Sequence, residues 1–161
     1  MNTFTELTLA ESIEVVQSMR ELDRRAVRAL LGYIGEEEFA ASRWSTDGPA
    51  WTVNQGGTPV AIGGLQFVNA WTGVFWFLAT NRIAGQTWGK LLRHTRTVIA
   101  NASNPAHEHY RHRIEAYTLD GWGGAERLVE RLGFVHEGAR RGAGSGGEDI
   151  NTWVITGPAR G

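Results

Sequence analysis

The chain has 161 residues, 16 basic and 17 acidic side chains, a formal net charge of −1, and no cysteine. This charge gives no global basic field for nucleic acid, and the lack of cysteine excludes disulfides, thiol catalysis and thiolate metal sites. No apolar run approaches the ~20 residues of a membrane-spanning helix, and the N-terminal segment lacks a signal-peptide pattern. We therefore expect one cytoplasmic domain over residues 1–161, without a nucleic-acid or membrane partner.

The first half of the chain predicts a strand, a group of helices and a hairpin. Apolar residues from Ile13 to Leu30 recur at helical spacing and predict one or two helices that end at Gly32 or Gly35. The glycines of the tight turn at 55–58 favour a hairpin. The other elements predicted here are a strand at 3–9, a helix at 36–43, and strands at 50–54 and 59–67.

The second half alternates strands and helices. The elements predicted in chain order are a strand at 73–79, a helix from Thr87 to about Asn101, a polar loop at 102–110, a strand at 113–119, a helix around 125–132, and strands at 134–140 and 149–156. This mixture predicts an α/β fold.

The run from Phe75 to Lys90, FWFLATNRIAGQTWGK, is the most informative stretch. It predicts a strand, a glycine-bearing loop and the start of a helix, whose first N–H groups lack intrahelical partners and favour a bound anion such as a diphosphate. The cationic residues of this helix suit either a solvated face or a phosphate site, and Lys90 lies in the predicted first turn. One apolar face supports the helix: Trp88, Leu91, Leu92, Thr95, Val98 and Ile99.

This order of elements resembles the GNAT superfamily of acyl-CoA-dependent N-acyltransferases. The segment AERLVERLGFVHEG, Ala125–Gly138, is similar to the family's last helix and the L-G-F turn that follows it, and Gln86-x-x-Gly89 matches two anchors of its phosphate signature. The resemblance implies a mixed, mostly antiparallel sheet of six to seven strands flanked by helices. Its fourth and fifth strands, 73–79 and 113–119, would be parallel and splayed.

The resemblance also implies a function, an acetyl-CoA-dependent N-acetyltransferase that acts on a primary amine of a small molecule or protein. Backbone N–H groups near Leu78 to Thr80 would bind the oxyanion of the reaction. The residues that the resemblance assigns to acetyl-CoA are Leu78, Ala79, Thr80, Gly85, Gln86, Thr87, Trp88, Gly89 and Lys90.

Three positions depart from the family pattern. Leu91 stands where a small residue lets the backbone approach the diphosphate, Trp122 replaces an asparagine, and Val129 replaces the tyrosine that protonates the leaving thiolate. Proton transfer must then come from other groups. Glu115 and Tyr117 lie on one face of the predicted fifth strand and are our candidate base and acid. The alternative is that Glu115 pairs with a neighbouring arginine and Tyr117 is a core-edge aromatic; His94 is the next candidate.

Other features favour plainer interpretations. His107, His109 and His112 could bind zinc, but their spacing favours a polar loop, and we predict no metal site. The glycine-rich segment 142–147 precedes a strand and favours a hairpin connection.

A closer similarity to small phage-encoded GNAT-like proteins rests on three features. These are the strand Gly57–Gly64, the phosphate loop in which Leu91 replaces the last small residue of the signature, and the L-G-F ending. It leaves two further functions open. One is a weakly active or inactive interaction module, with virion proteins or a second copy of the chain as partners. The other is a domain that binds CoA without turnover.

Overall fold

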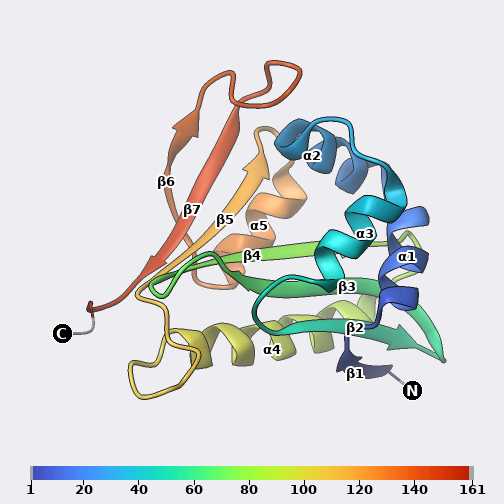
Figure 1. Cartoon of the computed structure of the whole chain (residues 1–161), viewed down its shortest axis with the longest axis horizontal. Coiled ribbons are helices and arrows are strands. Elements are labelled where there is room, and N and C mark those ends of the chain that lie inside the picture. The colour runs from blue at the N-terminus through green and yellow to red at the C-terminus, as the bar shows by residue number, and fades with distance from the viewer. Residues whose placement is uncertain (1, 160–161) are drawn as a thin grey trace.

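The computed structural model describes residues 2–159, which form seven strands and five helices (Figure 1). In chain order these are β1 (Asn2–Glu6), α1 (Leu9–Gln17), α2 (Glu21–Leu31), α3 (Glu36–Trp44), β2 (Ala50–Gln55), β3 (Thr58–Phe67), β4 (Thr72–Ala79), α4 (Gly85–Ala102), β5 (Arg113–Leu119), α5 (Gly123–Arg131), β6 (Val135–Arg140) and β7 (Ile150–Thr156).

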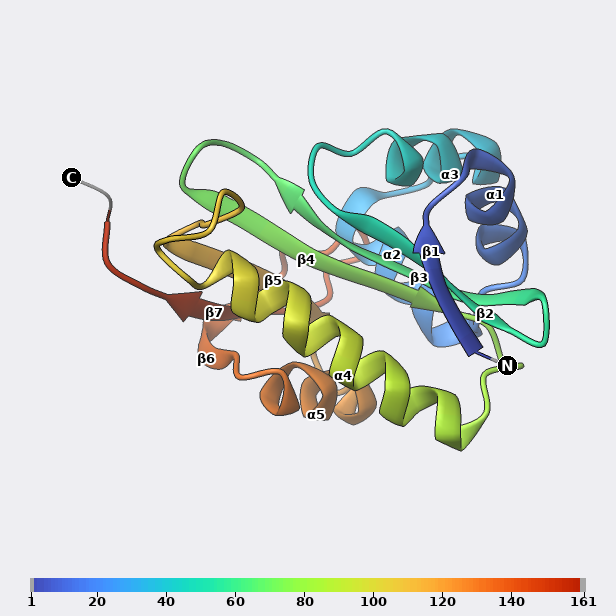
Figure 2. The same cartoon turned by 90° about the horizontal axis from the view of Figure 1, so that it is seen from below.

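One sheet contains all seven strands, in the order β1-β2-β3-β4-β5-β7-β6. Neighbouring strands are antiparallel except β4 and β5, which are parallel. Helices α1, α2 and α3 cover one face and α4 and α5 the other (Figure 2). A core cluster fills each interface. The predicted fold class is therefore confirmed.

The strands β4 and β5 pair over only three residues. Thr72 pairs with Arg113, Gly73 with Ile114 and Val74 with Glu115, and within residues 2–159 the two strands do not pair beyond these positions. The C-terminal halves of the two strands therefore lie apart, as the resemblance implied. This opening, between two strands that each carry polar backbone groups, is the feature that positions the site.

Local sequence explains the helix boundaries. Thr8 and Glu11 form a reciprocal capping box that begins α1. The long apolar face predicted from Ile13 divides into α1 and α2, and α2 ends at Gly32, whose φ of +76° is a conformation that glycine adopts without steric cost. Helix α4 begins at Gly85, two residues before the predicted start.

Two adjacent glycines of β3 let tryptophans lie flat on both faces of the sheet. A Cβ atom on Gly63 would lie 3.0 Å from the indole of Trp51, and one on Gly64 would lie 2.7 Å from the indole of Trp76. Trp51 belongs to the core under α4, whereas Trp76 packs on the α1–α3 side. Gly64 thus makes room for Trp76 on the face that α2 and α3 cover, and Gly63 for Trp51 on the opposite face.

Among residues 2–159, no helix has the length and apolar character that crossing a membrane requires.

Candidate active site

A cavity of about 810 Å³ lies at the opening between β4 and β5. Both helical layers and both strands line it. Its lining includes Arg20, Asp23, Val27, Leu30, Leu31, Phe39, Arg43, Trp76, Phe77, Gly85, Trp88, Gly89, Tyr117, Trp122, Arg127, Val129, Arg131 and Arg140. The cavity therefore joins the N-terminus of α4 to the sheet face under α2 and α3.

The N-terminus of α4 borders this cavity and can hold an anion. Ala84 is the N-cap residue; no side chain caps the helix, and its first turn contains no acidic residue. Gly85 and Gly89 line the cavity, and a Cβ atom on either would meet nothing within 4 Å. The first N–H groups of α4 and the positive end of its dipole therefore lie beside open space.

Gln86, Thr87 and Trp88 lie in the first turn of α4, whereas Lys90, predicted for that turn, lies in the second, because the helix begins at Gly85. Gln86 and Lys90 are exposed, Thr87 is buried, and Trp88 packs on Phe77 with ring centroids 5.6 Å apart. Trp88 therefore forms part of the cavity wall and lies beside the helix start, not across it.

Leu91 does not obstruct the helix start, contrary to the expectation from the sequence pattern. Its side chain is 2% exposed and belongs to the core between the sheet and α4. Because α4 already begins at Gly85, Leu91 lies in the second helical turn and points away from the cavity. The leucine that departs from the family pattern at this position therefore serves core packing.

Gln55, which sequence reasoning treated as a turn residue, holds the loop before α4. Its Oε1 accepts hydrogen bonds from the Ala84 N–H at 2.9 Å and the Thr87 hydroxyl at 2.7 Å. Its Nε2 donates to the Arg82 carbonyl at 3.0 Å. One amide at the end of β2 thus fixes three residues of the anion-binding turn. A lone glutamine beside two glycines carries no sequence signal for this role.

The backbone N–H groups of β4 point alternately toward β3 and toward the opening. The Thr80 N–H donates to the Val60 carbonyl of β3 at 2.9 Å. Bonded pairs alternate along an antiparallel ladder, so Leu78 also turns its N–H toward β3, while Phe77 and Ala79 turn theirs toward the opening. Of the predicted segment Leu78–Thr80, only Ala79 therefore has the right backbone orientation, and Phe77 joins it.

Arg20 and Asp23 already occupy the end of that edge. The Arg20 N–H donates to the Ala79 carbonyl at 2.9 Å, and the Ala79 N–H donates to the Asp23 carboxylate. The Arg20 guanidinium contacts Asp23 at 2.6 Å and lies over the rings of Trp88 and Trp122, at 5.4 and 5.6 Å. Burial raises the pKa of Asp23, and its bonds to Arg20 and Ala79 oppose that rise.

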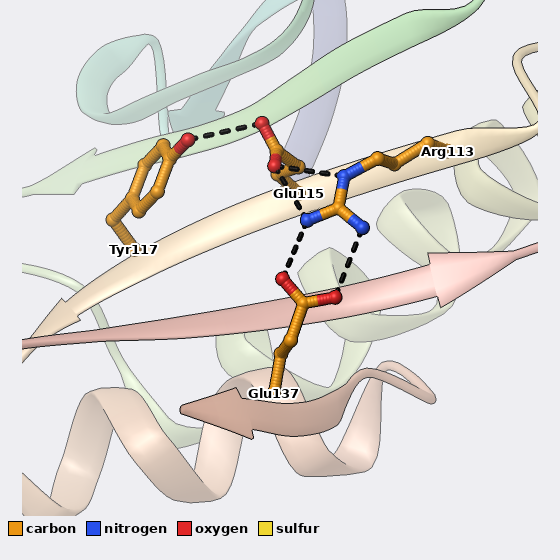
Figure 3. Close-up of polar contacts among 4 residues, drawn as sticks. All are labelled: Arg113, Glu115, Tyr117 and Glu137. Carbon is orange, nitrogen blue, oxygen red and sulfur yellow. Dashed lines mark hydrogen bonds and ion pairs between the residues drawn. The ribbon is translucent and has the colours of Figure 1, made fainter. Parts of the chain in front are cut away.

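Glu115 and Tyr117 lie together on β5, as predicted, within a larger polar network (Figure 3). The Tyr117 hydroxyl donates to Glu115 Oε1 at 3.0 Å, and Arg113 Nε donates to Glu115 Oε2 at 2.9 Å. Arg113 also binds Glu137 of β6 through two bonds, at 2.6 and 2.9 Å. Tyr117 lines the cavity, whereas Glu115 lies behind it.

Electrostatics keep Tyr117 protonated. Burial raises its pKa above 10, and the hydrogen bond to the Glu115 carboxylate and its negative charge raise it further. Arg140 and Arg113 act in the opposite direction. A phenol in this setting is a proton donor at neutral pH that points its proton at a carboxylate.

The remaining candidates lie elsewhere. Val129 is 4% exposed and lines the cavity wall, so no side chain on α5 supplies the missing phenol. His94 stacks on Phe4 with ring centroids 4.5 Å apart and contacts Trp51, near β1 and β2. It does not line the main cavity and is a poor alternative base.

The histidine-rich loop and the glycine-rich loop have other contacts. The rings of His107 and His109 lie 5.1 Å apart, but within residues 2–159 no three potential metal ligands converge. The loop at 142–147 connects β6 to β7, as predicted. Ser145 donates from its hydroxyl to the Arg28 carbonyl at 2.6 Å and from its N–H to the Ala29 carbonyl at 2.8 Å. This loop therefore attaches to the C-terminal part of α2, beside the cavity.

Comparison with solved structures finds the same fold in acetyltransferases. The ribosomal-protein-S18-alanine N-acetyltransferase of Escherichia coli is 18% identical over 100% of this chain and 97% of its own, with a TM-score of 0.71. A putative acetyltransferase of Salmonella typhimurium, solved with its cofactor acetyl-CoA, is 12% identical over 100% and 96%, with a TM-score of 0.70. A GNAT-family acetyltransferase of Bacillus anthracis is 14% identical over 96% and 94%, with a TM-score of 0.69.

The sequence itself matches no protein-family model and no curated protein. Identities of 12–18% over nearly whole chains are evidence of shared architecture. The parallel β4–β5 pair, its opening and the helix that follows belong to that architecture. The chain therefore has the fold of the GNAT-family acetyltransferases.

Proposed function

We propose that this protein is an acetyl-CoA-dependent N-acetyltransferase that transfers an acetyl group to a primary amine. The observation that carries the proposal is the cavity of about 810 Å³ where β4 and β5 separate, bordered by the uncapped N-terminus of α4. Neighbours in fold that are acetyltransferases, one of them solved with acetyl-CoA, support it.

The residues around the opening fit this co-substrate. The first N–H groups of α4, at Gly85 and Gln86, would bind the diphosphate, with the exposed cation of Lys90 nearby. The N–H of Phe77 lies beyond Val74, the last residue of β4 that pairs with β5. It would bind an oxygen of the extended chain of acetyl-CoA or of its thioester. The open space at Gly85 and Gly89 leaves room for the phosphates.

Acetyl-CoA supplies an acetyl group activated as a thioester. As the amine nitrogen forms a bond to the acetyl carbon, the carbon–sulfur bond breaks, the amine loses one proton and the sulfur gains one. Tyr117 lies at the cavity and can take the amine proton as it passes its own to Glu115. The return of that proton through Tyr117 to the sulfur restores both residues. Arg113 holds the other carboxylate oxygen of Glu115 and so positions it.

Calorimetry with acetyl-CoA tests the proposal directly. Wild-type protein should bind acetyl-CoA and release free thiol when an acceptor amine is present. Gly89→Glu should abolish binding, because it places a carboxylate against the diphosphate site at a position with space for a side chain. Gly89→Gln is the matched neutral control and should retain measurable binding. Absence of wild-type binding at millimolar acetyl-CoA would refute the proposal.

One observation favours a second candidate, a GNAT-fold interaction module with little or no catalysis, such as a virion-associated phage protein. Arg20 and Asp23 bond both polar backbone groups of Ala79, and the Arg20 guanidinium lies over the rings of Trp88 and Trp122 at the cavity. If neither the wild type nor Arg20→Ala binds acetyl-CoA, this second function replaces the first. Binding of acetyl-CoA by the wild type, with release of free thiol to an acceptor amine, rejects it.

A further inference from the structure

The cavity carries far more positive charge than the chain as a whole. Five arginines and one aspartate line it: Arg20, Arg43, Arg127, Arg131, Arg140 and Asp23. Within the described residues, Asp23 pairs with Arg20, and none of the other four arginines has a carboxylate within ion-pair distance. A chain with a formal net charge of −1 has therefore concentrated uncompensated cations at one site.

Arg43 is the most informative of these cations because it is far from the N-terminus of α4. It comes from α3 and lies on the opposite side of the sheet from α4, with its guanidinium over Phe39 at 5.5 Å and over Trp76 at 5.2 Å. Burial lowers its pKa. A half-buried guanidinium without a carboxylate partner is costly, and a bidentate carboxylate is the ligand that its planar fork matches best.

Arg140 extends the same positive surface toward the candidate proton relay. It comes from β6, and its guanidinium lies 5.6 Å from the ring centroid of Tyr117. On the α2–α3 side, the cavity is lined largely by apolar side chains, and two of them, Phe39 and Trp76, contact Arg43: Val27, Leu30, Leu31, Phe39 and Trp76. This half of the cavity thus combines cationic groups, an apolar wall and a phenol that can accept an amine proton.

We propose that the acceptor is an amino acid with an apolar side chain, whose carboxylate binds Arg43 while its amine reaches Tyr117. Arg140, beside Tyr117, adds a second positive charge to the cavity that attracts the carboxylate, and the apolar wall takes the side chain. This inference rests on the proposed acetyltransferase function and names its substrate class. A polyamine is a poor acceptor for this cavity, because its extra ammonium groups would face unpaired guanidinium groups.

Matched acceptor pairs isolate the carboxylate. Thiol release from acetyl-CoA is measured with L-phenylalanine against 2-phenylethylamine, and with L-leucine against 3-methylbutylamine; spermidine is the cationic reference. Each amino acid should exceed its decarboxylated partner in kcat/KM by about 10-fold or more, the scale of a lost charge-assisted hydrogen bond. Equal or better use of the decarboxylated amines or of spermidine would overturn the inference and leave the acetyltransferase function standing.

Variants locate the carboxylate site. Arg43→Met should raise KM for the amino acid about 10-fold or more with little change in acetyl-CoA affinity, and Arg140→Met, at an exposed position, should raise it less. Arg93→Met is the control, because Arg93 is exposed on α4 and does not line the cavity. The assignment to Arg43 is wrong if KM for the amino acid is the same in Arg43→Met and Arg93→Met. It is also wrong if Arg43→Met lowers acetyl-CoA affinity by as large a factor as it raises KM for the amino acid.

A binding experiment separates this inference from the proposed function. Calorimetry without acetyl-CoA measures N-acetyl-L-phenylalanine against N-acetyl-2-phenylethylamine. Preference for the carboxylated compound, lost in Arg43→Met and reduced in Arg140→Met, supports the anionic site even if acetyl-CoA does not bind. No preference in wild type overturns the inference whether or not acetyl-CoA binds.

Discussion

Gln55 should determine how well the turn before α4 is formed. Gln55→Ala removes its bonds to the Ala84 N–H, the Thr87 hydroxyl and the Arg82 carbonyl. A typical hydrogen bond contributes ~1 kcal/mol, and water can replace some of these at a half-exposed site. We expect the free energy of unfolding to fall by about 1–3 kcal/mol. Acetyl-CoA affinity should fall as well, because the N–H groups of the turn are no longer held in place.

Gln55→Glu tests the effect of a negative charge at this position while it keeps the hydrogen bonds to Ala84 and Thr87. The carboxylate keeps the acceptor for Ala84 and Thr87 but loses the donor to Arg82. The lost bond costs ~1 kcal/mol, and a negative charge near a helix N-terminus returns about 0.3–1 kcal/mol, so stability should stay close to wild type. Two like charges at ~8 Å in an effective dielectric of ~20 repel by about 2 kcal/mol, so acetyl-CoA affinity should fall about 10-fold or more.

Urea unfolding and calorimetry with acetyl-CoA measure the two effects. Gln17→Ala, at an exposed position on α1, is the control for removing a glutamine. Wild-type stability and wild-type affinity in Gln55→Ala would refute the claim that this residue organises the turn. Unchanged affinity in Gln55→Glu would show that the diphosphate does not bind near the start of α4.

Three further predictions concern the polar groups of β5 and β6 and the α1–α2 connection. Glu115→Gln should lower turnover about 10²- to 10⁴-fold, and Tyr117→Phe should do the same because it breaks the relay to Glu115, each with little effect on acetyl-CoA affinity; unchanged steady-state rates in both would reject the relay. Arg20→Ala should tighten acetyl-CoA binding in calorimetry, because it removes the guanidinium from between two indoles; weaker binding would mean that Arg20 contacts the ligand. The bonds from Arg113 lower the pKa of Glu137, so the stability that Glu137 adds relative to Glu137→Gln should be present at neutral pH and lost as pH falls through the lowered folded pKa; urea unfolding in a pH series downward from pH 7 measures it, and a difference between the two proteins that grows as the pH falls would contradict it.

Sequence patterns predicted most of the secondary structure because those patterns are local. The end of α2 at Gly32, the strand pattern of β4 and the apolar face of α4 each depend on residues within one or two turns or along one strand. The parallel, separated pair β4 and β5 was predicted only through the resemblance to a known fold, since pairing between strands that are 34 residues or more apart leaves no local pattern.

The candidate site likewise contains residues that the sequence identified and contacts that only the folded chain determines. The sequence by itself identified the glycine-bearing turn before α4 and placed Glu115 and Tyr117 on one face of a strand. The tertiary structure decided what these groups touch: it turned Leu91 into the core, placed Gln55 against Ala84, and brought Arg20 to the edge of β4. These contacts join segments 29 to 59 positions apart, and their energy depends on packing and backbone direction that only the folded sheet supplies.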